Sequence, residues 1–164
     1  MKTLLGQDVL ERFAMKYLKN ASTFGALSDE AICWLINKGK VSELEAEQKV
    51  FEHDERGDSF FVVLEGRFSY YKWRNDKYTF IRHYEFGQQI GFMSMIALHP
   101  RVGQAVADRD SIVVEVNNDL FYQLHQNNPQ DFGLLMMNLA REMARTLSAV
   151  DSIVADRKDG LINE

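Results

Sequence analysis

The chain has 164 residues and a mass of 19.0 kDa, which is the size of one domain. Its only cysteine is Cys33, so an intramolecular disulfide framework and a cysteine-based zinc cluster are excluded. The net charge is −5, from 19 basic and 24 acidic residues. Proteins that bind duplex DNA usually carry a basic excess, so we expect no direct DNA binding.

The negative charge is concentrated in residues 43–58, which hold seven acidic and two basic side chains. Such a run is usually a solvated face, and it disfavours a phosphate ligand nearby. No apolar run reaches the roughly 18 residues that a membrane-spanning helix needs, so we expect no membrane insertion. The first residues lack the apolar core of a signal peptide. With one unpaired cysteine, we expect a cytoplasmic protein.

The N-terminal residues 1–23 are predicted to be helical, because Val9, Phe13 and Tyr17 recur at helical spacing. After a break, Ser28 is placed to cap a second helix. Gly39 is expected to end that helix.

Residues 40–117 are predicted to form a series of short strands. Residues 59–64 are a short apolar run between turn residues, and residues 77–84 alternate between two faces. Asn75 and Asp76 are typical of a hairpin turn. Short strands at about 8–12-residue spacing predict an antiparallel sandwich, jelly roll or barrel.

A short helix is predicted over residues 118–125, and Pro129 then begins a long helix that continues to about Asp156. At 1.5 Å per residue this helix is about 42 Å long, which exceeds the core of a compact domain. It either pairs with the same helix of a second copy or packs back over its own sheet. Its apolar positions follow a seam that is close to a coiled coil: Phe132, Met136, Leu139, Met143, Leu147 and Val150.

The candidate binding segment lies between the predicted strands. Gly87 and Gly91 allow tight turns, and residues 91–98 can form two short helical turns whose N-terminus suits a phosphate. Arg101 follows at the start of a strand, where its guanidinium could clamp the same anion. The alternative is an ordinary loop in which Arg101 pairs with an acid such as Asp108.

Three motifs then occur in order: residues 50–66, which end in an apolar-X-Gly turn, Gly91 with Ile90 before it, and Arg101 with Pro100 before it. Together they resemble the cyclic nucleotide-binding domain family, which includes the bacterial catabolite activator and the regulatory subunit of cyclic-AMP-dependent protein kinase. The resemblance covers residues 24–147. It implies an α+β fold, namely an antiparallel, jelly-roll-like β-roll over residues 24–128. A helical segment, residues 1–23, precedes the roll, and a long dimerisation helix with a short tail, residues 129–164, follows it.

The resemblance implies that a phosphate-binding cassette supplies the ligand contacts, and these fall on Gly91, Phe92, Met93, Ser94, Arg101 and Val102. The family normally has Gly-Glu-Leu where this chain has Gly91-Phe92-Met93, and the family glutamate accepts a hydrogen bond from the ribose 2′-hydroxyl. Phe92 cannot accept that bond, and losing such a buried partner costs about 1–3 kcal/mol.

Two hypotheses follow from this departure. In one, the site still takes a cyclic nucleotide, such as cyclic AMP, cyclic GMP or a cyclic dinucleotide. In the other, nucleotide binding is lost and the domain is a dimeric protein-docking module.

We expect no enzyme activity, because the chain shows no nucleophile–base pair and no metal-ligand spacing. Its four histidines form no His-X-His or His-Glu-X-X-His motif, which leaves a cupin-like metal enzyme as a distant alternative. Only eight residues follow Asp156, too few for a helix-turn-helix. The sequence therefore predicts a regulatory or sensor domain that signals through a downstream protein partner.

Overall fold

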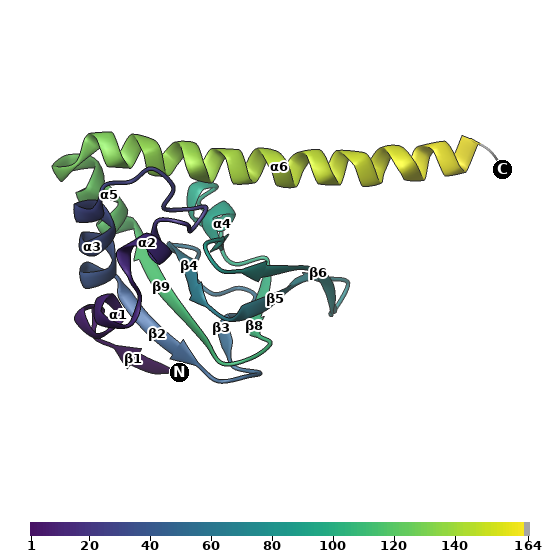
Figure 1. The fold of residues 1–164 in the computed structure, drawn as a ribbon. Helices are drawn as coiled ribbons and strands as arrows, with labels where there is room; N and C mark the ends of the chain where they lie inside the picture. The colour runs from purple at the N-terminus through teal and green to yellow at the C-terminus, as the bar shows by residue number, and fades with distance from the viewer. Residues whose placement is uncertain (163–164) are drawn as a thin grey trace.

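The structure is a computed structural model that describes the backbone of residues 1–162 and the side chains of residues 1–157. Helices lie mainly at the two ends of the chain and strands in its middle, as Figure 1 shows. The strands are β1 (Lys2–Leu4), β2 (Lys40–Leu44), β3 (Lys49–Phe51), β4 (Ser59–Glu65), β5 (Arg67–Arg74), β6 (Lys77–Glu85), β7 (Gln89–Ile90), β8 (Gly103–Ala107) and β9 (Ser111–Asn117). The helices are α1 (Gly6–Arg12), α2 (Met15–Leu18), α3 (Asp29–Lys38), α4 (Phe92–Ile96), α5 (Asn118–Asn127) and α6 (Pro129–Ile162).

Two antiparallel sheets form a β-roll. One has five strands in the order β1-β2-β9-β4-β7, and the other has four in the order β3-β8-β5-β6. The helices α1, α3 and α5 gather at one side of the roll, and α6 crosses above it (Figure 1). The predicted α+β fold with a long C-terminal helix is confirmed.

Strand β4 is buried on both faces, which explains its continuous apolar sequence. Phe60, Val62 and Leu64 face the helices and belong to the larger core, while Phe61 and Val63 face the interior of the roll. Successive side chains of a strand point to opposite faces, so a strand between two cores needs apolar residues at every position.

The N-terminal segment differs from the single predicted helix. Residues 13 and 14 have extended backbone angles and separate α1 from α2. This break lets the ring of Tyr17 stack on Phe13, at 5.4 Å between centroids, and pack in a tilted arrangement against Phe86, at 4.1 Å. Strand β1, which the sequence did not predict, pairs with β2 and joins the N-terminus to the first sheet. The division of the chain at residues 24 and 129 stays a prediction.

The predicted local signals at helix and hairpin ends are confirmed. Ser28 accepts a hydrogen bond from a backbone N–H in the first turn of α3, as predicted, and the side chain of Asn117 caps α5 in the same way. Asn75 and Asp76 connect β5 to β6 with φ values of 52° and 56°, the left-handed angles that a two-residue hairpin turn requires.

Helix α6 divides into a packed part and a projecting part. Leu135 and Leu139 are fully buried in the core of their own domain, whereas Leu147 and Val150 are 62% and 48% exposed. Figure 1 shows the far end of α6 running past the β5–β6 hairpin. The helix continues to Ile162 through Gly160, so the predicted end near Asp156 was wrong. In the described part of the chain, no helix has the length and apolar character to cross a membrane.

Candidate functional site

The candidate site is built around residues 91–102, which we call the cassette. Gly91 has a φ of 90°, and a Cβ there would lie 2.5 Å from Nη1 of Arg101. The glycine is therefore required both by its backbone angle and by the close approach of the arginine. The short helical turn predicted after Gly91 is α4.

The guanidinium of Arg101 is turned into the protein. It is 2% exposed, and it donates to the carbonyl oxygen of Gly91 at 2.9 Å and to Oγ of Ser59 at 3.0 Å. It also lies over the ring of Phe51, 4.5 Å from the centroid. The alternative pairing with Asp108 was wrong, because Asp108 instead accepts from Arg67 at 2.7 Å.

Arg101 faces acidic residues across a cavity of about 420 Å³, which we call the small cavity. Burial lowers the pKa of the Arg101 guanidinium, while the carboxylates of Glu115, Asp58 and Glu55 act in the opposite direction. The group stays charged at neutral pH, because arginine deprotonates only far above it. Among the described residues, no carboxylate lies within 4 Å of it and its Nε has no hydrogen-bond partner.

Phe92 stands where the family glutamate is expected, and it is 1% exposed. Its ring packs at right angles to Phe60, at 5.5 Å between centroids, and lies 6.2 Å from Phe121. Phe121 in turn contacts Phe132 of α6 at 4.9 Å. Phe92 is therefore part of an aromatic cluster that joins the cassette to α5 and α6.

A larger cavity of about 820 Å³, the large cavity, lies between the cassette, the β5–β6 hairpin and α6. The predicted cassette residues on its wall are Gly91, Phe92, Met93, Ser94 and Val102, and the predicted seam residues on it are Met136, Met143, Leu147 and Val150. Arg101 is absent from that wall and lines the small cavity instead. Two seam residues lie elsewhere, because Leu139 is buried in the core and Phe132 contacts Phe121.

The wall of the large cavity also carries polar side chains that the sequence analysis did not find. They include Lys72 of β5, Arg82 of β6, and Glu142 and Thr146 of α6. Nη1 of Arg82 donates to Oγ1 of Thr146 at 2.9 Å, and burial raises the pKa of the Glu142 carboxyl. Strand alternation placed Arg82 on one face of β6, but which face meets α6 follows only from the tertiary structure.

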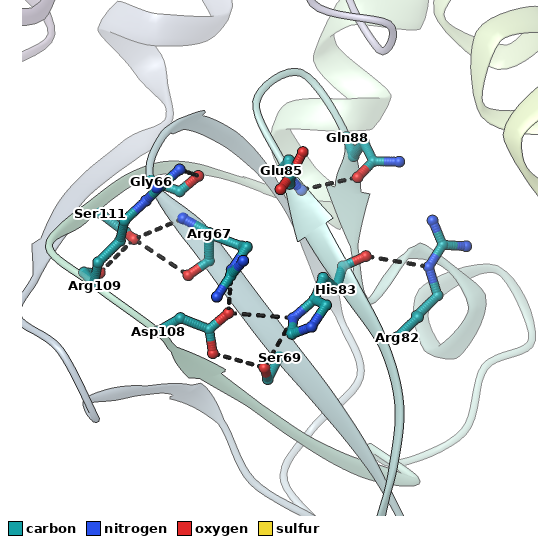
Figure 2. A network of polar contacts seen from close by, with 10 residues as sticks. All are labelled: Gly66, Arg67, Ser69, Arg82, His83, Glu85, Gln88, Asp108, Arg109 and Ser111. Carbon is teal, nitrogen blue, oxygen red and sulfur yellow. Dashed lines mark hydrogen bonds and ion pairs between the residues drawn. The ribbon is translucent and has the colours of Figure 1, made fainter.

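A second polar cluster lies on the other side of β6 and braces the sheet. Oγ of Ser69 donates to Asp108 at 2.6 Å, and Nδ1 of His83 lies 3.2 Å from the same carboxylate (Figure 2). The serine hydroxyl thus donates to the carboxylate instead of to the imidazole, which is not the arrangement of an activated nucleophile. Within the described residues, no three His, Cys, Asp or Glu side chains gather into a metal site.

Comparison with known proteins decides the family. A family model for the cyclic nucleotide-binding domain matches residues 41–128, more than half of the chain. The chain belongs to the cyclic nucleotide-binding domain family. The match spans the strands β2 to β9, the cassette and α5.

Solved structures share the fold at low sequence identity. A cyclic nucleotide-binding domain from Methylobacillus flagellatus is 24% identical, with a TM-score of 0.78 over 94% of this chain and 88% of that one. The catabolite activator protein of Thermus thermophilus is 19% identical, with a TM-score of 0.69 over 81% of this chain and 61% of that one. The regulatory domain of Toxoplasma gondii PKA, solved with cAMP, is 16% identical, with a TM-score of 0.65 over 80% of this chain and 48% of that one.

A curated relative is much longer than this chain. Lysophospholipase NTE1 of Cryptococcus neoformans is 26% identical over 139 residues, which is 85% of this chain and 8% of that protein. The similarity is therefore confined to a small part of the relative.

Proposed function

We propose that this chain is a non-catalytic regulatory domain that senses a small ligand in the large cavity and signals through α6 to a protein partner. The observation that carries the proposal is the shared wall of that cavity, to which both the cassette and Met136, Met143 and Leu147 of α6 contribute. A ligand that contacts both elements changes the free energy of their arrangement, which is the requirement for coupling. An output without direct DNA binding and a cytoplasmic location remain predictions.

The aromatic cluster offers a route from the cassette to α6. Phe92 of α4 contacts Phe121 of α5, and Phe121 contacts Phe132 in the first turn of α6. We infer that a shift of α4 displaces these rings and re-angles α6 about the segment 117–129. A closely packed cluster transmits such a shift because it cannot deform continuously.

We further propose that a second copy of the chain covers the projecting half of α6. Leu147, Val150 and Val154 are each about half exposed or more, at 62%, 48% and 47%. They continue the seam whose first half is packed, and such a seam is typical of paired helices. The signal to a downstream protein would then pass through a dimer.

Family membership makes cyclic AMP, cyclic GMP and a cyclic dinucleotide the first ligands to test. A specific observation favours the second candidate, a protein-docking module without nucleotide binding. Phe92 and Arg101 are both buried, and the guanidinium lines the small cavity instead of the large one. A phosphate clamp would require Arg101 to leave Gly91 and Ser59.

Hydrogen–deuterium exchange tests the proposal with each of the three nucleotides at millimolar concentration. A ligand that binds in the large cavity should slow exchange in both the cassette and residues 136–150 of α6. Ala144→Trp, which fills that cavity from α6, should remove the effect, and Ala149→Trp, five residues further along α6 and outside the wall, should keep it. Unchanged exchange with all three nucleotides would support the docking module.

A further inference from the structure

We propose that the ligand of the large cavity is an amphipathic organic anion, and that Lys72 and Arg82, in place of Arg101, hold its charged group. The inference rests on the proposed function, in that it takes the large cavity to be the ligand site. It goes further by naming the chemical class of the ligand and the side chains that select it.

The two cations share one face of the β5–β6 hairpin. Tyr70 is the register partner of Arg82, and Lys72 lies two residues along β5 from Tyr70, so the three side chains point to the same side. Both cations line the large cavity. Figure 2 shows Arg82 on the opposite side of β6 from the imidazole of His83 and from Asp108 and Ser69, with a bond from Arg82 to the backbone carbonyl of His83.

The charges of Lys72 and Arg82 are not neutralised by an ion pair. Among side chains 1–157, neither cation has a carboxylate within 4 Å, whereas Arg67 and Arg56 do. Arg82 donates from Nη1 to Thr146 and, at 3.4 Å, from Nε to the carbonyl oxygen of His83, which leaves Nη2 for a ligand. A guanidinium with a free donor beside an ammonium group suits a carboxylate, sulfonate or phosphate.

Arg101 is less suited to the same role. Its guanidinium is 2% exposed, is held by Gly91 and Ser59, and faces the carboxylates of the small cavity. An anion that recruited Arg101 would have to break both bonds and separate the guanidinium from those acids.

The remaining wall matches a hydrocarbon body better than a sugar. Ile81, Ile96, Met136 and Met143 contribute apolar surface, and the methionines can adapt to different shapes. The amide oxygen of Gln89 is already occupied by the backbone N–H of Phe92. A ribose hydroxyl would therefore have to pair with another polar group of the wall, such as Oε1 of Glu142, which has no hydrogen-bond partner among the described residues.

One carboxyl, that of Glu142, shares the wall with the two cations. Its Oε1 is buried without a hydrogen-bond partner among the described residues, and burial raises the pKa of the group. The guanidinium of Arg82 acts on the same pKa in the opposite direction, so this carboxyl and the cation attract each other within the wall.

The test uses 8-anilinonaphthalene-1-sulfonate, an apolar anion whose fluorescence rises on binding, with the neutral N-phenyl-1-naphthylamine as its uncharged counterpart. The full chain should bind the sulfonate at one site, and dodecanoate should displace it more effectively than cyclic AMP. Arg82→Gln should weaken sulfonate binding about tenfold and Lys72→Gln severalfold, because each removes a charged contact. Neither substitution should change binding of the neutral probe by more than about twofold.

Matched controls keep the outcomes distinct. Arg74→Gln and Lys77→Gln remove cations from the same hairpin outside the wall, and they should leave sulfonate affinity unchanged. If Arg101→Lys loses affinity for the sulfonate while Arg82→Gln and Lys72→Gln keep it, the assignment of Arg82 and Lys72 to the charged group is overturned. Binding of a cyclic nucleotide in the large cavity without binding of either organic anion would overturn this inference while leaving the proposed function intact.

Discussion

Arg101 donates a hydrogen bond to the carbonyl oxygen of Gly91 across 2.9 Å, and this bond ties the two ends of the cassette together. A second bond, to Ser59, anchors the cassette to β4. The residue that the family resemblance assigns to phosphate binding thus supports the fold of the site in this structure.

Arg101→Ala is expected to lower the free energy of unfolding by about 2–4 kcal/mol, because two buried charge-assisted hydrogen bonds are lost and a space is left beside Phe51. Urea unfolding followed by circular dichroism measures the change. Arg56→Ala removes an arginine whose side chain is 86% exposed, and it should change the same quantity by less than about 0.5 kcal/mol. Equal effects of the two substitutions would contradict a bracing role for Arg101.

Phe92→Glu introduces the residue type that the family normally has at this position. We expect the change to destabilise the fold instead of creating a ribose contact. The carboxylate would be buried against Phe60 and Phe121, so we expect a loss of about 3–5 kcal/mol in stability. Phe92→Leu keeps an apolar side chain and should cost about 1–2 kcal/mol. A stable Phe92→Glu protein would show that the ring is not an essential part of the cluster.

The start of α6 depends on Asp131, whose carboxylate accepts from the backbone N–H of Ser28 at 2.7 Å and from its hydroxyl at 2.8 Å. Asp131 is 5% exposed, and Asp131→Ala should cost about 2–3 kcal/mol because the N–H of Ser28 is left unpaired. Thermal unfolding checks this, with the exposed Asp151→Ala on the same helix as the control. A melting temperature that stays at the wild-type value in Asp131→Ala would disprove the anchoring role.

Acid should weaken the polar cluster in which Asp108 contacts Ser69, Arg67 and His83. Partial burial alone would raise the pKa of the Asp108 carboxyl, but hydrogen bonds from Ser69 and Arg67 outweigh it, and the pKa is lowered. A lowered folded-state pKa gives stability that is present above the unfolded value near 4 and is lost as the pH falls through the folded value.

The measurement for that prediction is urea unfolding between pH 7 and pH 2.5. The free energy of unfolding of the wild-type chain should decline below about pH 4. Asp108→Asn should remove part of that decline, whereas Asp110→Asn should leave it in place. If the two variants and the wild-type chain lose stability in parallel, Asp108 does not contribute to it.

Self-association should depend on the projecting half of α6. Leu147→Glu with Val150→Glu places two charges on the seam and should give a 19.0 kDa monomer in sedimentation equilibrium, whereas we expect the unmodified chain to form a dimer at micromolar concentration. Ser148→Glu with Ala149→Glu adds the same charge beside the seam and should leave the dimer intact. A monomeric unmodified chain at high micromolar concentration would rule out the dimer.

Patterns of local spacing predicted most of the fold. The cap at Ser28, the hairpin turn at Asn75 and the left-handed turn at Gly91 each depend on a few neighbouring residues, and each is confirmed. The break between α1 and α2 was not predictable, because it is stabilised by contacts between Tyr17 and the distant Phe86. The strand β1 likewise depends on pairing with β2, some forty residues away in the sequence.

The candidate site was predicted less completely than the fold. The sequence placed Gly91, Arg101 and Phe92 in one segment, but it did not show that the last two side chains are buried. Burial of Phe92 depends on Phe60 and Phe121, and the position of Arg101 depends on Ser59 and Phe51. Lys72 and Arg82 were not found because only the meeting of α6 with the hairpin makes their face a cavity wall.

The central claim is that the large cavity between the cassette and α6 is a ligand site. Calorimetric titration of the full chain and of Ala144→Trp tests it directly, with cyclic AMP, cyclic GMP, a cyclic dinucleotide and 8-anilinonaphthalene-1-sulfonate as ligands. The account predicts that at least one of them binds the unmodified chain at a single site and that Ala144→Trp abolishes the binding. Absence of heat from all four at millimolar concentration, or equal binding to the Ala144→Trp chain, would contradict it.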